Sequence, residues 1–383
     1  MKNLTLYVNG FYGCAVTKSA IKMKLDFCIR LFGQVLTLIL FFNGLAVFSA
    51  CTEKNKAVME AYQLRIHGKV DDAKNLLENI LNEDSTNAMA HYELARTLNY
   101  MNLRGSEKAD HHLANALEYD PDNVTYAYYN AKSCFLKAYI ALQTDGKNAQ
   151  KLVENSCNEF VHVLELKNNY PEALMYLVEF YGDLPEELGG DKTKAEEYTR
   201  QLEKMDKFYG AKARLVMMPQ GTDMVEYWEK YIEEHGEDSK VLKELGVANL
   251  FNDNVEGAQK SFEKAMALDK TQNIRLLDLS RYHMMKVMQN RDVADVELPK
   301  CKKYIEQYLA STPEPIPPLK AYALGMMVKI NMFSGNQEEG KKIMEEAKAI
   351  DPYFSRAFGI PSLALFEAPN KPDHHFQSYF IPY

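Results

Sequence analysis

Residues 239–272 carry the pattern that most constrains how this chain can fold. Two apolar stretches of about equal length flank an Asn-Asp-Asn tripeptide, and these residue types favour a turn. Gly246 before the turn and Ala258 after it are small, as close crossing of two helices requires. Phe262 and Ala265 lie one turn apart on one face of the second stretch. The segment is therefore predicted to form two packed helices joined by a tight turn.

This spacing resembles the tetratricopeptide repeat, a 34-residue helix–turn–helix unit. Further copies or longer helical pairs occupy residues 54–87, 88–123, 124–171, 172–207, 208–238, 273–312 and 321–354. Such units bury their apolar faces only against their neighbours. The resemblance implies an all-α, right-handed superhelical solenoid of about eight helix pairs over residues 54–354, with a concave groove. The less regular pairs at 124–238 leave open a bend that divides the array into two lobes.

In tetratricopeptide proteins the first helix of each pair lines the groove, at known positions of the repeat. In three repeats of this sequence those positions hold a mixture of aromatic, basic and apolar side chains. They are Tyr92, Arg96, Asn99, Tyr100, Lys240, Lys243, Val247, Leu250, Phe251, Tyr322, Lys329, Met332 and Phe333. The Lys/Asn set with which chaperone adaptors hold a C-terminal carboxylate is not reproduced. The resemblance implies a groove for a peptide or another extended ligand, and half of these side chains are equally expected to pack only against neighbouring helices.

An apolar run at residues 31–48 follows a short basic lead. Polar residues and glycines interrupt this run, whereas a spanning helix needs roughly 20 predominantly apolar residues. A basic front and a short apolar run that ends in small residues are typical of a signal peptide. Met23 opens an ordinary signal sequence, so we expect translation to start there and residues 1–22 to be a miscalled leader. The alternative is a permanent N-terminal membrane anchor.

The run ends in Phe-Ser-Ala-Cys at residues 48–51, which resembles the lipobox of bacterial lipoproteins. In that family the cysteine is acylated and becomes the first residue. The resemblance implies that residues 1–50 are removed, that Cys51 carries the lipid, and that residues 51–53 form a short tether. Because Thr52 replaces the aspartate that often signals inner-membrane retention, the family pattern points to the outer membrane of a bacterial envelope, facing the periplasm.

Removal of residues 1–50 leaves a more acidic chain. The whole sequence has 45 basic and 53 acidic residues, and the leader holds five of the basic ones and one of the acidic ones, so the mature net charge is −12. An acidic surface disfavours nucleic acid and anionic lipid as electrostatic partners. We therefore expect no nucleic-acid partner, and a membrane attachment that comes from the acyl chains.

Arrangements of residues typical of enzymes and metal sites do not occur in the sequence. It lacks H-E-x-x-H, C-x-x-C and G-x-S-x-G. The Gly-Gly segment at 184–198 lacks phosphate-loop spacing, so it is predicted to connect two helices, with Asp191 as N-cap and Ala195 at the crossing. That segment is also similar to a stretch of periplasmic tetratricopeptide proteins, including the T component of some tripartite solute transporters. We predict no catalytic residue, metal or cofactor.

Histidines and the single tryptophan have structural interpretations. His111 and His112 point about 100° apart on a helix and cannot share a metal ion by themselves. We expect this pair, and His374 and His375, to be solvated. Trp228 is predicted to lie in the core.

Cys134 and Cys157 lie about 11 residues on either side of a predicted turn at residues 145–146. Antiparallel helices would place them at similar heights, with axes about 8–10 Å apart. A disulfide requires Cα atoms within about 7 Å. Contact between the two thiols is therefore predicted rather than a bond. The alternative is two buried free thiols.

The tail at residues 355–383 contains four prolines and six aromatic residues. Prolines exclude a continuous helix, and disordered tails are poor in aromatic residues. We expect an irregular but ordered tail that packs over the final helices or into the groove. The alternative is a tail that becomes ordered only when it binds a partner.

These features favour a non-enzymatic, lipid-anchored envelope scaffold that binds a protein or peptide partner through its concave face. The alternative is an accessory component of an envelope uptake system that binds a small solute or glycan in the groove. An open groove would favour the first function, and a closed, polar-lined cavity the second. The sequence carries no signal for the oligomeric state.

Overall fold

The computed structural model describes residues 53–102, 106–144, 148–219 and 221–354. Within these ranges the regular structure is helical, and no helix is both long and apolar enough to cross a membrane. The α-helices are α2 (Glu53–Ile66), α3 (Val70–Glu83), α4 (Ala88–Met101), α5 (Glu107–Tyr119), α6 (Val124–Thr144), α7 (Ala149–Leu166), α8 (Pro171–Asp183), α9 (Lys192–Met205), α10 (Lys207–Met217), α11 (Met224–His235), α12 (Ser239–Phe251), α13 (Val255–Leu268), α14 (Arg275–Gln289), α15 (Ala294–Leu309), α16 (Pro317–Phe333) and α17 (Gln337–Ile350). Three short 3-10 segments are η1 (Glu186–Leu188), η2 (Lys270–Ile274) and η3 (Arg291–Val293). The predicted leader, the lipidation site at Cys51 and the tail at 355–383 lie outside the described residues.

The helices follow one another as eight pairs, from α2 with α3 to α16 with α17. This confirms the predicted all-α repeat solenoid and the number of its pairs. The fifth pair is the least regular, since α10 packs mainly on α8 and α9 while α11 packs on α12. One hydrophobic cluster nevertheless runs from Leu174 in α8 through Trp228 to Ala248 in α12. The array is therefore continuous rather than divided into two lobes, and Trp228 is a core residue as predicted.

The repeat at 239–272 forms as its sequence predicts. Asp238 caps α12 by accepting hydrogen bonds from the backbone N–H groups of residues 240 and 241, and Asn254 caps α13. Between them, Asp253 adopts a left-handed φ of 59°, a conformation that short polar residues tolerate. A Cβ atom on Gly246 would lie 2.3 Å from the ring of Phe262, which is completely buried. Only glycine therefore allows α12 and α13 to pack this closely.

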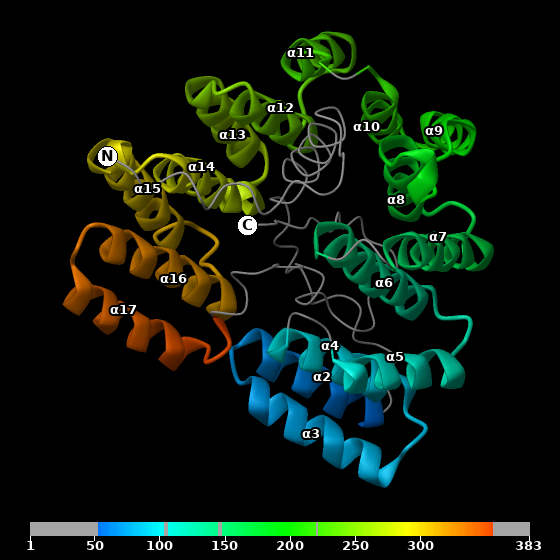
Figure 1. The fold of residues 1–383 in the computed structure, drawn as a ribbon. Coiled ribbons are helices and arrows are strands. Elements are labelled where there is room, and N and C mark those ends of the chain that lie inside the picture. The colour runs from blue at the N-terminus through cyan, green and yellow to red at the C-terminus, as the bar shows by residue number, and fades with distance from the viewer. Residues whose placement is uncertain (1–52, 103–105, 145–147, 220, 355–383) are drawn as a thin grey trace, which may run out of the picture.

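First and second helices of the pairs differ in how much of their surface they bury. Ten residues of α4 are buried but only three of α5, and the same numbers apply to α8 and α9. In Figure 1 the first helices, such as α6, α8 and α14, lie toward the middle of the array, and second helices such as α7, α9 and α17 lie outside. We call the side formed by the first helices the inner face.

The last repeat returns to the first, so the solenoid closes into a ring (Figure 1). The hydroxyl of Tyr100 in α4 donates to the carboxylate of Asp351, and the hydroxyl of Tyr353 donates to Asp71 in α3 at 2.7 Å. Gly68, in the turn after α2, packs so tightly on the end of α17 that a Cβ atom would lie 2.1 Å from the carbonyl oxygen of Ile350. We call these contacts the seam. They make the predicted concave groove the inside of a closed ring.

Candidate binding surface on the inner helices

Two arginines share one carboxylate between α2 and α4. Arg65 Nε donates to Glu93 Oε1 at 2.6 Å, and Arg96 Nη1 donates to Glu93 Oε2 at 3.1 Å. All three side chains are completely buried. Guanidinium groups stay protonated in proteins, so both arginines are positively charged. We call Arg65 and Arg96, with Glu93 between them, the arginine pair.

Tyrosine rings surround the arginine pair. The guanidinium carbon of Arg65 lies 5.6 Å from the ring centre of Tyr62, and that of Arg96 lies 5.2 Å from Tyr92 and 5.9 Å from Tyr129. The negative face of an aromatic ring attracts a cation at such distances. Burial raises the pKa of Tyr129, so its hydroxyl stays protonated. The site therefore combines two cations with the aromatic rings that surround them.

A second group of buried charges begins on α10 and α12. Glu244 Oε1 accepts from Lys212 at 3.1 Å and from Lys243 at 2.5 Å, and all three side chains are almost completely buried. Burial lowers the pKa of Lys243 to about 7, an effect that the positive charges of Lys212 and Arg275 reinforce and that Glu244 opposes. The positive charge of Lys243 is therefore held only weakly, and an anion bound nearby would favour its protonated form.

The same arrangement continues on α14 and α16. Asp278 pairs with Arg275 three residues earlier and lies 3.9 Å from Arg281 three residues later. Arg281 Nε also donates to the hydroxyl of Tyr322 in α16 at 2.7 Å. Burial raises the pKa of Asp278, although Arg275 and Arg281 oppose the shift. Burial, together with the charge of Arg281, lowers the pKa of Lys329.

These side chains form one band along the inner face. Lys243 on α12 and Arg275 on α14 lie close enough to influence each other electrostatically, which joins the two groups. We call the set the cationic band: Lys212, Lys243, Glu244, Arg275, Asp278, Arg281 and Lys329. It holds five basic and two acidic side chains. The net charge of the whole chain is −8, so this band differs in sign from the molecule as a whole.

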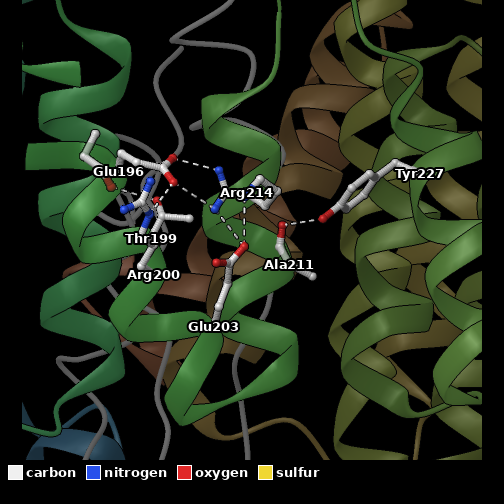
Figure 2. Close-up of polar contacts among 8 residues, drawn as sticks. Glu196, Thr199, Arg200, Glu203, Ala211, Arg214 and Tyr227 are labelled. Atoms are coloured by element: carbon white, nitrogen blue, oxygen red, sulfur yellow. Dashed lines mark hydrogen bonds and ion pairs between the residues drawn. The ribbon is translucent and has the colours of Figure 1, made fainter. Parts of the chain in front are cut away.

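A cluster of the same residue types between α9 and α10 is balanced instead (Figure 2). Arg214 donates to Glu196 Oε2 at 2.7 Å through Nη1, and to Glu203 Oε1 at 2.9 Å through Nε. Arg200 adds a bond of 2.9 Å to Glu196. Two arginines here contact two carboxylates at a partly exposed position, whereas both arginines of the arginine pair contact the same buried carboxylate.

The residues predicted to line a groove have several different surroundings. Tyr92, Arg96, Tyr100, Lys243 and Tyr322 are buried members or neighbours of the inner charged clusters. Asn99 and Lys329 are half-buried, and Asn99 donates to the hydroxyl of Tyr129 at 3.3 Å. Val247, Leu250 and Phe251 belong to an apolar cluster with Phe262 and Leu279. Lys240, Met332 and Phe333 are exposed. The structure thus gathers about half of the predicted set around the inner charges.

Sequence reasoning missed Arg65, Glu93, Lys212, Glu244, Arg275, Asp278 and Arg281. Each lies on a first helix, at a position outside the tetratricopeptide groove pattern or in a repeat too irregular for that pattern to be applied. One signal was available. Glu93 and Arg96 are three residues apart within an otherwise weakly charged stretch, and Arg275, Asp278 and Arg281 repeat every three residues. Charges at helical spacing inside apolar helices indicate buried ion pairs.

The Gly-Gly segment forms a connection between helices, as predicted. Asp191 caps α9 by accepting from the N–H groups of Thr193 and Lys194, and Ala195 is completely buried at the crossing. The backbone N–H groups of residues 188–191 all donate to carbonyl oxygens of residues 181–186. These donors are therefore already used and do not form a phosphate cradle.

The prediction of solvated histidines is wrong for His112. His112 Nδ1 lies 2.8 Å from Nδ1 of His91, whose Nε2 lies 3.0 Å from the carbonyl oxygen of Ser85. Burial, and then the neighbouring His91, lower the pKa of His112 to about 4. The packing of α4 on α5 brings His112 to His91. The sequence shows only that His111 and His112 are adjacent, and this gives no sign of the contact with His91. Among the described residues no group of three or more His, Cys, Asp or Glu side chains is placed to hold a metal ion.

Cys134 and Cys157 are free thiols on the packed helices α6 and α7. Burial raises the pKa of Cys134 to about 11 and that of Cys157 to about 12. Nucleophilic chemistry requires the thiolate, so both thiols are unreactive at neutral pH. Their direct contact remains a prediction.

No family model matches the chain, and no curated protein matches its sequence. Among solved structures it is similar to PilW, a widely conserved type IV pilus biogenesis factor, with 13% identity and a TM-score of 0.27 over 81% of this chain and 100% of that one. It is also similar to human IFIT1 in a dimer with m7Gppp-AAAA, with 14% identity and a TM-score of 0.28 over 79% of this chain and 72% of that one. The repeat architecture follows from the helix pairs themselves rather than from these similarities.

Proposed function

We propose that the protein is a non-enzymatic, lipid-anchored adaptor of the bacterial envelope that holds an acidic segment of a protein partner on its inner face. The observation that carries this proposal is the set of basic side chains that the first helices hold on the inner face of the ring. Five basic side chains and two carboxylates make up the cationic band, and the arginine pair adds two arginines around Glu93. Basic side chains gathered along one surface are expected to attract a ligand of opposite charge.

The position of α2 supports a short link to the membrane. This helix begins at Glu53, so only Thr52 separates it from Cys51, the residue that resembles a lipidation site. An acylated Cys51 would hold the first repeat against the bilayer surface. Arg65 lies twelve residues further along α2, about 18 Å from the start of the helix at 1.5 Å per residue. The arginine pair would then stand within reach of partners that approach along the membrane.

Intact-mass measurement of the membrane-extracted protein tests the anchor. We expect an N-terminus at Cys51 with added acyl mass, and release or failed processing of the Cys51→Ser variant. An unmodified N-terminus upstream of residue 51 would contradict the anchor. Co-sedimentation with separated inner and outer membranes tests the predicted outer-membrane location.

Capture of partners from detergent-solubilised envelope tests the binding face. The inner-face variant carries Lys243→Met and Arg281→Met, which remove charge from the cationic band while Glu244 and Asp278 each keep one basic neighbour. The matched control carries Lys260→Met and Arg200→Met, one lysine and one arginine from exposed ion pairs. We expect a partner that the wild type and the control capture and the inner-face variant does not. Equal capture by all three proteins would contradict the proposal.

A second function, binding of an anionic solute for an uptake system, is favoured by the seam. Closure of the ring through Tyr100, Asp351, Tyr353 and Gly68 makes the inner face less accessible to a folded protein than an open groove would be. Capture of no protein by the wild type, with a small anion that co-purifies from the envelope, would favour this function.

A further inference from the structure

We propose that the arginine pair binds one carboxylate group of the ligand, with Arg65 as its principal contact. The inference rests on the proposed function, since it specifies the chemistry of one point on the same inner face. It also differs from the groove residues expected from the sequence, because Arg65 and Glu93 are not among them.

The donors of Arg65 carry the argument. Its Nε is used by Glu93 at 2.6 Å, whereas Nη1 and Nη2 have no hydrogen-bond acceptor among the described residues although both atoms are buried. Unsatisfied buried donors are rare in proteins, and they are more costly on a charged group. The two remaining nitrogens form the end of a planar fork. This fork matches the two oxygens of a carboxylate, which guanidinium groups bind through two parallel hydrogen bonds.

The surroundings of the arginine pair suit a carboxylate on an organic molecule. The rings of Tyr62, Tyr92 and Tyr129 around the cations offer an apolar wall for the carbon chain that carries the carboxylate.

Unused donors are not a general property of arginines in this chain. In the cluster between α9 and α10, Arg214 Nε donates to Glu203, and both of its terminal nitrogens meet carboxylate oxygens at 2.7–3.3 Å (Figure 2). Arg214 therefore has its anions built in, whereas Arg65 has one built-in anion that it shares with Arg96. This makes Arg214 a matched control for Arg65.

The site lies beside the seam, which gives a ligand a way to reach it. Burial and the contact with Asp351 raise the pKa of Tyr100, and Arg65 is close enough to that phenol to oppose the shift. Tyr100 in turn holds Asp351 at the end of the last repeat. Opening of these contacts between the first and last repeats is the route by which we expect a ligand to reach the arginine pair.

Calorimetric titration of the detergent-solubilised, full-length protein at pH 7 tests the assignment. The probes are 3-phenylpropionate, its neutral amide 3-phenylpropionamide, and phenylphosphonate. We expect one 3-phenylpropionate per chain, no binding of the amide, and weaker binding of the phosphonate. Arg65→Lys keeps the charge but loses the planar fork, so its affinity for the carboxylate is expected to fall at least about tenfold. Arg214→Lys is expected to bind like the wild type.

Circular dichroism confirms that Arg65→Lys is folded before its affinity is interpreted, and Arg65→Gln replaces it if it is not. The assignment is overturned if the amide binds as tightly as the carboxylate, if the phosphonate binds more tightly, or if Arg65 variants keep wild-type affinity. Partner capture that depends on the cationic band, without carboxylate binding at Arg65, would contradict the carboxylate site and support the proposed function. Carboxylate binding without any captured protein would support the carboxylate site and contradict the proposed function.

Discussion

The arginine pair and the cluster around Arg214 contain the same residue types in different surroundings. Between α2 and α4 one completely buried carboxylate serves two arginines, whereas between α9 and α10 two partly exposed carboxylates serve two. A buried charge that loses its only partner is strongly destabilising, while a partly exposed pair contributes little because water replaces it. The same chemical contact therefore has different consequences on the inside and the outside of the ring.

This difference extends to the helices that carry the charges. Inner helices such as α12 bury charged side chains and leave little free space around glycines, whereas outer helices such as α13 and α17 carry exposed pairs three or four residues apart. Structure and ligand binding are therefore expected to depend on the inner helices, and outer charges mainly keep the surface hydrated. Four substitutions, each with an outer or unconstrained counterpart, test this division.

The largest effect is expected for Glu93→Gln. The substitution removes the carboxylate that two completely buried arginines share, and breaking a buried ion pair in this way costs about 3–5 kcal/mol. Glu203→Gln, the outer counterpart, removes one of two carboxylates from Arg214 at a partly exposed position and is expected to cost at most about 1 kcal/mol. Thermal unfolding followed by circular dichroism measures both. Similar losses of stability in the two variants would show that the buried and the partly exposed cluster do not differ in this way.

The next effect concerns the seam. Gly68 and Gly335 occupy equivalent turns, after α2 and after α16, with left-handed φ angles of 79° and 78°. Alanine at either position is expected to cost about 1–2 kcal/mol of backbone strain. Gly68→Ala should cost roughly 1–3 kcal/mol more from overpacking, because its Cβ would lie 2.1 Å from the carbonyl oxygen of Ile350, whereas Gly335 has no atom within 4 Å of that position.

Small-angle scattering separates seam opening from general destabilisation. We expect a larger radius of gyration for Gly68→Ala and an unchanged one for Gly335→Ala. Equal stability and equal size of the two variants would show that the ring does not depend on this contact.

A smaller effect is expected where inner and outer helices each contain a glycine. Gly246→Ala in α12 would place a Cβ 2.3 Å from the buried ring of Phe262, so overpacking should exceed the gain in helix propensity and leave a net loss of about 1–2 kcal/mol. Gly340→Ala in α17 meets nothing closer than 3.4 Å and should gain up to about 1 kcal/mol. If the inner helices are the more tightly packed, chemical denaturation will show a lower free energy of unfolding for Gly246→Ala and a higher one for Gly340→Ala. A gain for Gly246→Ala would contradict the packing described here.

The smallest effect is a pH dependence that originates in Lys243. Because burial lowers the pKa of Lys243 in the folded protein, the unfolded chain binds more protons between about pH 7 and its ordinary pKa of 10.5. Stability contributed by this residue therefore rises with pH in that window, by at most about 1.4 kcal/mol per pH unit. Between pH 7.5 and 8.5 the wild type should gain stability relative to Lys243→Met. Lys260→Met, from the exposed pair with Glu256, should show the wild-type profile. Parallel profiles of wild type and Lys243→Met would contradict the buried charge.

Much of the fold could be read from the sequence because each helix pair is a local structure. Small residues at the crossing, capping residues such as Asp191 and Asn254, and turn residues at the predicted places define the pairs, and the structure forms them there. These signals act over fewer than 40 residues, so they do not depend on the rest of the chain. The core position of Trp228 followed in the same way from its place in an amphipathic helix.

The candidate site was less predictable, because its contacts join separate repeats. Arg65 meets Glu93 across 28 residues, and the groove positions transferred from the repeat pattern included Arg96 but neither of those two. Val247 and Phe251 occupied expected groove positions, yet they pack against Phe262 and Leu279 in apolar layers between the helices. A repeat pattern gives the face of a helix, whereas the neighbouring repeats decide what that face touches.

The sequence by itself determined the helical pairs, their number, their turns and the acidic net charge, because these depend on local residue types and on composition. Tertiary structure alone decided that the array closes into a ring, since the seam joins Tyr100 to Asp351 and Asp71 to Tyr353 across more than 250 residues. It also decided that an acidic protein presents its cations inside, because small rotations between successive repeats accumulate and determine which charges meet.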